Sequence, residues 1–161
     1  MIRSIKIIMI VYAALLLQVT VLPAYFADPF KPNLLIIAVA WLSLREGGVH
    51  GVLLSFLLGL IADCFSGHYL GLNAFSFLTI HLGMRHVAGR LYVDSVYLMV
   101  LVVFLATLLN GINQLLLLFL FSLADGIYSS LFAGLLPQAL VNALAASLLF
   151  SVPKFSAREE V

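Results

Sequence analysis

Charged residues are scarce in this sequence, and their scarcity decides the class of protein. Asp, Glu, Lys and Arg together make up 9% of the 161 residues, whereas hydrophobic residues make up 64% and the mean hydropathy is +1.19. A water-soluble domain usually carries about 25% charged residues. So few charges cannot cover a water-facing surface, and we therefore predict an integral membrane protein.

Cysteine and recognisable catalytic motifs are also nearly absent. The single cysteine, Cys64, excludes an internal disulfide and a cysteine-based metal site. The sequence has no paired-aspartate metal motif, no phosphate-binding glycine loop with a lysine and no His-Glu-x-x-His. The nearest Ser–His pair, Ser66 and His68, falls in a predicted loop without a third group. We therefore expect no enzymatic activity, no metal and no cofactor.

Long runs without any charged residue predict the transmembrane helices. A membrane span needs about 20 mostly apolar residues, and four uncharged runs reach that length: Ile7–Ala27, Cys64–Met84, Ser95–Ala124 and Gly126–Pro153. Two shorter uncharged runs lie on either side of a turn at residues 45–48. The sequence therefore predicts one all-α transmembrane domain over residues 1–161, a bundle of six helices. Their expected ranges are about 5–26, 33–44, 48–64, 70–86, 95–123 and 127–152.

The distribution of basic residues predicts the orientation of this bundle. Basic residues concentrate on the cytoplasmic side of membrane proteins. With the N-terminus in the cytoplasm, only Lys31 of the eight basic residues falls outside. We therefore predict an inner-membrane protein with both termini in the cytoplasm. Because topology accounts for the cations, the net charge of +1 gives no reason to expect a nucleic-acid partner. The seven inside cations are Arg3, Lys6, Arg45, Arg85, Arg90, Lys154 and Arg158.

Polar residues gather in the stretch GLIADCFSGHYLGLN, residues 59–73, where the third expected helix turns into the fourth. Asp63 could accept hydrogen bonds from the amides of this turn, and Asn73 could cap the fourth helix or bond the backbone of the loop. Gly67 and Gly71 can take backbone angles that other residues avoid. Three interpretations of Asp63 stay open: a polar helix end in interfacial water, a clamp on the turn, and a ligand or proton site. We favour a rigid corner over a reaction centre.

Small residues recur every four positions along the third expected helix. They are Gly47, Gly51, Ser55 and Gly59, and Asp63 continues the same spacing. This spacing lets another helix approach closely in a membrane. We expect the neighbouring helix to belong to the same chain.

Two further helices carry polar side chains inside uncharged runs. Thr107, Asn110 and Gln114 share one face of the fifth expected helix, and Gln138 and Asn142 lie one turn apart on the sixth. Amides in hydrocarbon need hydrogen-bond partners. Both faces should therefore point into the bundle or a subunit interface, either as hydrogen bonds between helices or as the lining of a polar pocket. His81 is likewise expected to hydrogen-bond across the bundle.

The segment from Pro32 to Leu78 resembles the central signature of the MreD family of rod shape-determining membrane proteins. The length and the six-helix layout fit the family across the whole chain. The resemblance is carried by Pro32, the turn at Arg45–Gly51, Phe56, Gly59, Asp63, the pair Ser66-Gly67 and the run Leu70-Gly71-Leu72-Asn73.

This resemblance implies a role that composition does not show. It implies a non-enzymatic part of the machinery that inserts peptidoglycan along the side wall of rod-shaped bacteria. The expected direct partner is MreC, with RodA, a penicillin-binding transpeptidase and MreB in the same complex or reached indirectly, and with membrane lipids around the bundle. The fold is expected to be similar to the substrate-binding subunits of energy-coupling-factor transporters. That likeness leaves an alternative open, a membrane subunit that binds a small molecule or a lipid.

Overall fold

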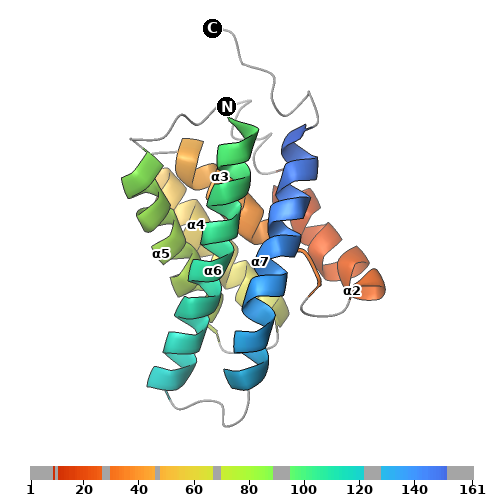
Figure 1. Ribbon diagram of the computed structural model, residues 1–161. Helices are drawn as coiled ribbons and strands as arrows, with labels where there is room; N and C mark the ends of the chain where they lie inside the picture. Colours follow the sequence, from red (N-terminus) through yellow and green to blue (C-terminus); the bar gives the residue numbers. More distant parts are fainter. Residues whose placement is uncertain are drawn as a thin grey trace, which may run out of the picture.

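The computed structural model describes residues 9, 11–26, 30–45, 48–66, 70–88, 95–121 and 128–151. This part of the chain is all-helical and contains six helices, as the sequence predicts (Figure 1). The first runs over Val11–Tyr25 and includes a π-helical turn, η1 (Leu17–Val21), followed by α2 (Leu22–Tyr25). The others are α3 (Leu34–Arg45), α4 (Val49–Ser66), α5 (Leu72–Ala88), α6 (Val96–Leu120) and α7 (Tyr128–Ser151).

Helix bounds lie close to those expected, but the first helix is less regular than its composition suggests. The largest difference at a described end is three residues, at the end of α6, where residue 123 was expected and Leu120 is observed. The π turn immediately precedes Pro23 of α2. Proline has no N–H to donate to the preceding turn, and π turns occur mostly as single insertions of this kind.

Three of the helices are long and apolar enough to cross a membrane: α4, α6 and the Leu131–Ser151 part of α7. The described first helix and α3 are apolar but shorter. At 1.5 Å per residue the 12 residues of α3 extend over about 18 Å, against a hydrocarbon core of about 30 Å. The expectation that every helix is a full span is therefore supported by length for only three of them.

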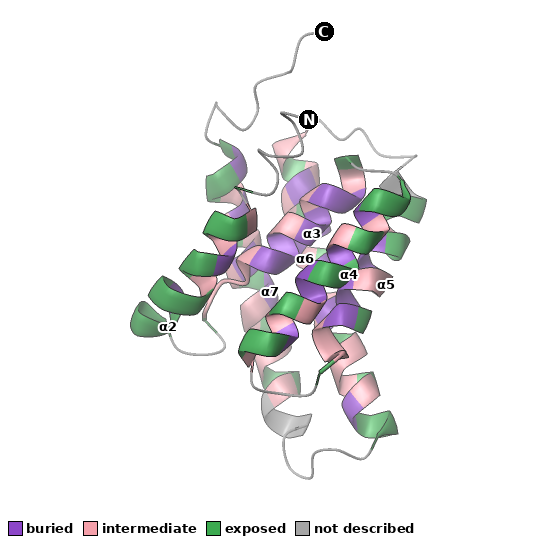
Figure 2. Cartoon of the chain, turned by 180° about the vertical axis from the view of Figure 1, so that it is seen from behind, coloured by how far each residue is buried: buried purple, intermediate pink, exposed green. Residues whose placement is uncertain are grey.

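The short helix α3 lies at the centre of the bundle. It contacts α4, α5, α6 and α7, and Ile36, Val39 and Ala40 on it are fully buried. Phe77 of α5 and Val103 of α6 belong to the same buried apolar cluster. Figure 2 shows buried residues running along α3 while exposed residues face outward on the surrounding helices. A helix enclosed on most sides needs no polar face, which explains its nearly continuous apolar sequence.

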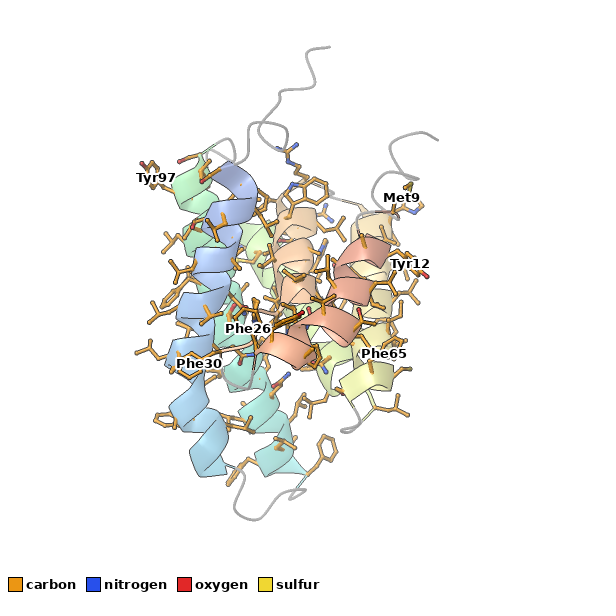
Figure 3. The ribbon with its side chains drawn as sticks, turned by 90° about the vertical axis from the view of Figure 1, so that its right-hand side faces the viewer. Met9, Tyr12, Phe26, Phe30, Phe65 and Tyr97 are labelled. Atoms are coloured by element: carbon orange, nitrogen blue, oxygen red, sulfur yellow. The ribbon has the colours of Figure 1, made fainter. Side chains whose placement is uncertain are left out.

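Large apolar side chains cover the outside of the bundle. Exposed positions of this kind occur on every described helix except the central α3. In water such a surface would drive aggregation, whereas in a bilayer it faces lipid tails. The labelled side chains in Figure 3 include several of these residues: Met9, Tyr12, Phe26, Phe30, Phe65 and Tyr97.

The small residues of α4 pack against α5, so the expected close neighbour belongs to the same chain. Gly51, Ser55 and Gly59 are all buried. A Cβ atom added at Gly59 would lie 2.4 Å from Cα and 2.7 Å from N of Ala74 at the start of α5. The two backbones are therefore as close as glycine permits at this point. The first member of the predicted stripe, Gly47, lies outside the described residues.

We expect Gly59→Ala to destabilise the bundle, because its methyl group would meet backbone atoms that cannot move independently of α5. Overpacking of this kind costs about 1–3 kcal/mol, which should appear as a lower thermal unfolding midpoint in detergent. The matched control is Gly83→Ala, where the added Cβ meets only Leu109 Cδ2, at 4.0 Å. Equal midpoints for the two alanine variants would contradict the close approach of α4 and α5.

Candidate functional site

The candidate site is the corner at which α4 ends and α5 begins. Asp63 lies in the last turn of α4 and is only 3% exposed. Gly71 has a φ angle of +97°, in the region that favours glycine, and it directly precedes the first residue of α5. Gly67, which was expected to contribute to this turn, lies outside the described residues.

The Asp63 carboxylate accepts four hydrogen bonds from the far side of this corner. Oδ2 accepts from the backbone N–H groups of Gly71 at 2.8 Å and Ala74 at 3.1 Å. Oδ1 accepts from the backbone N–H of Asn73 at 2.9 Å and from its side-chain Nδ2 at 3.0 Å. The first N–H groups of a helix have no partner within the helix, and a negative charge is favourable at that end. Asp63 of α4 therefore caps α5.

This geometry distinguishes two of the three interpretations of Asp63. A polar helix end in interfacial water does not fit a side chain that is almost fully buried. A clamp on the turn fits, because both oxygens are occupied by donors from Gly71, Asn73 and Ala74. The expected capping role of Asn73 is wrong, since Asn73 itself lies within α5 and Asp63 caps the helix in its place.

The side chain of Asn73 connects this corner to α6. Its Oδ1 accepts a hydrogen bond from Gln114 Nε2 at 2.8 Å. Further along the same pair of helices, Thr79 Oγ1 accepts from Asn113 Nδ2 at 2.6 Å. The carboxylate of α4, the start of α5 and the polar face of α6 thus form one chain of hydrogen bonds.

A second polar cluster surrounds the start of α3. Gln18 Oε1 accepts from the backbone N–H groups of Leu34 at 2.7 Å and Leu35 at 3.3 Å. Asn142 Oδ1 of α7 accepts from the backbone N–H of Asn33 at 2.6 Å. Because α3 is short and begins inside the bundle, its first N–H groups need side-chain partners rather than water.

The same cluster extends to α6. Asn33 Oδ1 accepts from the backbone N–H of Ile36 at 3.2 Å and from Gln18 Nε2 at 3.1 Å, and Asn142 Nδ2 donates to Thr107 Oγ1 at 3.0 Å. Pro32 directly precedes the cluster, consistent with its expected place before this helix. Neither Gln18 nor Asn33 was among the residues predicted to take part in such contacts. An asparagine between a proline and an apolar run is a typical helix cap, so Asn33 carried a usable signal.

Three of the five polar residues predicted on α6 and α7 hydrogen-bond to other helices: Thr107, Gln114 and Asn142. Asn110 is buried, and its Oδ1 has no partner among the described residues. Gln138 is half-buried and makes no hydrogen bond within the described part of the chain. Thr107, Gln114 and Asn142 therefore fit the prediction that these polar faces make hydrogen bonds between helices.

Ser55 and His81 form a further polar contact between α4 and α5. Ser55 Oγ lies 2.9 Å from His81 Nδ1, so the expected bond of His81 across the bundle is present. Both side chains are fully buried, and no substrate could reach this pair without a large opening of the helices. Among the described residues, no three His, Cys, Asp or Glu side chains come together as a metal site.

We expect thermal stability to fall in the order wild type, Asp63→Asn, Asp63→Leu. Hydrogen bonds to charged groups contribute about 1.5–3 kcal/mol each. Asparagine keeps one acceptor oxygen but sets an NH₂ group against two of the donors, whereas leucine leaves every donor without a partner. The unfolding midpoint of each purified variant in detergent tests this order. A leucine variant as stable as the wild type would contradict the clamp.

Comparison with known proteins places the chain in a family. Searches among curated proteins and among solved structures found no match, so the expected likeness to energy-coupling-factor subunits stays a prediction. The family model described as rod shape-determining protein MreD matches residues 1–155. Because this match covers almost all of the 161 residues, the chain belongs to the MreD family, whose members are membrane components of the cell-shape machinery.

Proposed function

We propose that this protein is a non-enzymatic inner-membrane component of the cell-elongation machinery that binds MreC and helps to organise side-wall peptidoglycan synthesis. The observation that carries the proposal is the family match over residues 1–155. Support also comes from the use of polar groups within the bundle. Asp63, Gln114 and Asn142 make hydrogen bonds that join helices of this chain, as expected of a structural protein rather than an enzyme.

A partner would therefore be bound by the outer faces of helices. The links between consecutive helices are short in the sequence, which leaves little chain for a separate binding domain. Membrane helices associate through close packing and a few hydrogen bonds. In this proposal MreC contacts the bundle directly, and RodA, the penicillin-binding transpeptidase and MreB belong to the same complex or are reached through MreC.

The proposed orientation places both termini in the cytoplasm, because seven of the eight basic residues then lie inside. Reporter fusions at Phe30 and at the C-terminus test it. We expect a periplasmic signal from the first and a cytoplasmic signal from the second. A periplasmic C-terminus would overturn this orientation.

We expect depletion of the protein to round rod-shaped cells and the tagged protein to co-purify with MreC. A photocrosslinking residue placed at one exposed position on each of the three helices long enough to cross a membrane would test for the contact: Leu53 on α4, Leu105 on α6 and Leu144 on α7. At least one of these positions should give an adduct with MreC. The matched control is Val39, which is fully buried within α3 and should give none.

Two results together would contradict the proposal. One is rod shape maintained after depletion in a strain without a second copy of the gene. The other is the absence of any MreC adduct from all three exposed positions at normal protein levels.

A further inference from the structure

Exposed cationic and imidazole side chains gather at one end of the bundle. Arg45 ends α3, His50 lies in the first turn of α4, and Arg85 and His86 lie in the last turn of α5. All four are exposed. The short link from α3 to α4 and the antiparallel course of α4 and α5 bring these three helix ends together (Figure 1). We call this set of four residues the basic end.

Within the described residues, no carboxylate neutralises the basic end. The one described acidic residue is Asp63, which lies at the opposite end of α4 and is occupied by the α5 amides. Glu46 follows Arg45 in the sequence and lies outside the described residues. Within the described part of the chain, neither guanidinium group, of Arg45 or of Arg85, has a carboxylate partner, and both side chains are exposed.

The position of Arg45 suits the boundary between membrane and water. Its Cζ lies 5.5 Å from the centroid of the Trp41 ring, in a cation–π contact. Tryptophan is enriched at the level of lipid headgroups. This contact holds one guanidinium close to the bundle at that level, and guanidinium groups match the oxygen geometry of phosphate.

An apolar stripe runs away from the basic end along α4. Val49, Leu53 and Leu57 are 72%, 52% and 51% exposed, and their spacing of four residues places them on one side of the helix. Val49 adjoins His50, so the stripe begins at the basic end. The basic end and the apolar stripe are therefore continuous. Together they could bind an amphiphile, the basic end its anionic head and the stripe its hydrocarbon chain.

We propose that the basic end is a binding site for an anionic glycerophospholipid. Arg45 and Arg85 bind the lipid phosphate, His50 and His86 add hydrogen-bond donors around the headgroup, and an acyl chain lies along the α4 stripe. The attraction is that of basic clusters near helix ends for anionic lipids, with Trp41 fixing one of the two arginines. Through this site the protein would bind a lipid in addition to its protein partners.

The test compares thermal unfolding of the purified full chain in an uncharged detergent with phosphatidylglycerol or phosphatidylcholine added. We expect phosphatidylglycerol to raise the midpoint of the wild type more than phosphatidylcholine does. The double variant Arg45→Gln/Arg85→Gln should lose at least half of that difference. The control is Lys31→Gln, which removes a positive charge before the start of α3 and should keep the full difference.

Native mass spectrometry of the same samples supplies a second measurement, which does not depend on the stability of the double variant. We expect fewer bound phosphatidylglycerol molecules on the double variant than on the wild type or on Lys31→Gln. Equal binding of phosphatidylglycerol by all three proteins would overturn the proposal. Equal stabilisation of the wild type by the two lipids would also overturn it. So would a rise of the unfolding midpoint with inorganic phosphate alone that is as large as the rise with phosphatidylglycerol.

Discussion

Every polar group that this chain places within its bundle needs a hydrogen-bond partner from the chain itself, because lipid offers none. The requirement is strictest for Asp63, which carries a charge and is almost fully buried. Four donors from the turn and from the first residues of α5 bond to this carboxylate and satisfy the requirement. Since Asn73 also binds Gln114, the same carboxylate is linked through Asn73 to α6. The corner therefore connects α4, α5 and α6 by hydrogen bonds.

The same requirement explains how the structure accommodates a central helix of only 12 residues. Three N–H groups at the start of the short α3, those of Asn33, Leu34 and Leu35, donate to Gln18 and Asn142. These side chains come from the first helix and from α7, far apart in the sequence. Close packing completes the arrangement at Gly59, where α4 and α5 approach to a distance that excludes a Cβ atom. Both features define how the helices pack, and neither uses an ion pair between described residues.

The sequence predicted the helices, a close neighbour of α4 within the same chain and the acceptor role of Asp63, because apolar runs, small-residue spacing and a lone carboxylate are local signals. It did not predict the π turn before Pro23. Nor did it predict the role of Gln18, which depends on where α3 begins inside the folded bundle. The capping role predicted for Asn73 was wrong for a similar reason. Its side chain instead bonds to Asp63 of α4 and Gln114 of α6, and these contacts depend on the tertiary structure. Gln138 lies one helical turn before Asn142, but among the described residues it has no hydrogen-bond partner.

Family membership and geometry lead to one account, in which a rigid membrane bundle of the cell-shape machinery is fixed at the Asp63 corner. Hydrogen exchange of individual amides in detergent tests this account most directly. The Phe75 amide bonds to the Gly71 carbonyl at 2.9 Å and provides an internal reference for a bonded amide of α5. We expect the amides of Gly71, Asn73 and Ala74 to exchange as slowly as that of Phe75, and to exchange faster in Asp63→Leu. Rapid exchange of these three amides in the wild type, with Phe75 protected, would contradict the account.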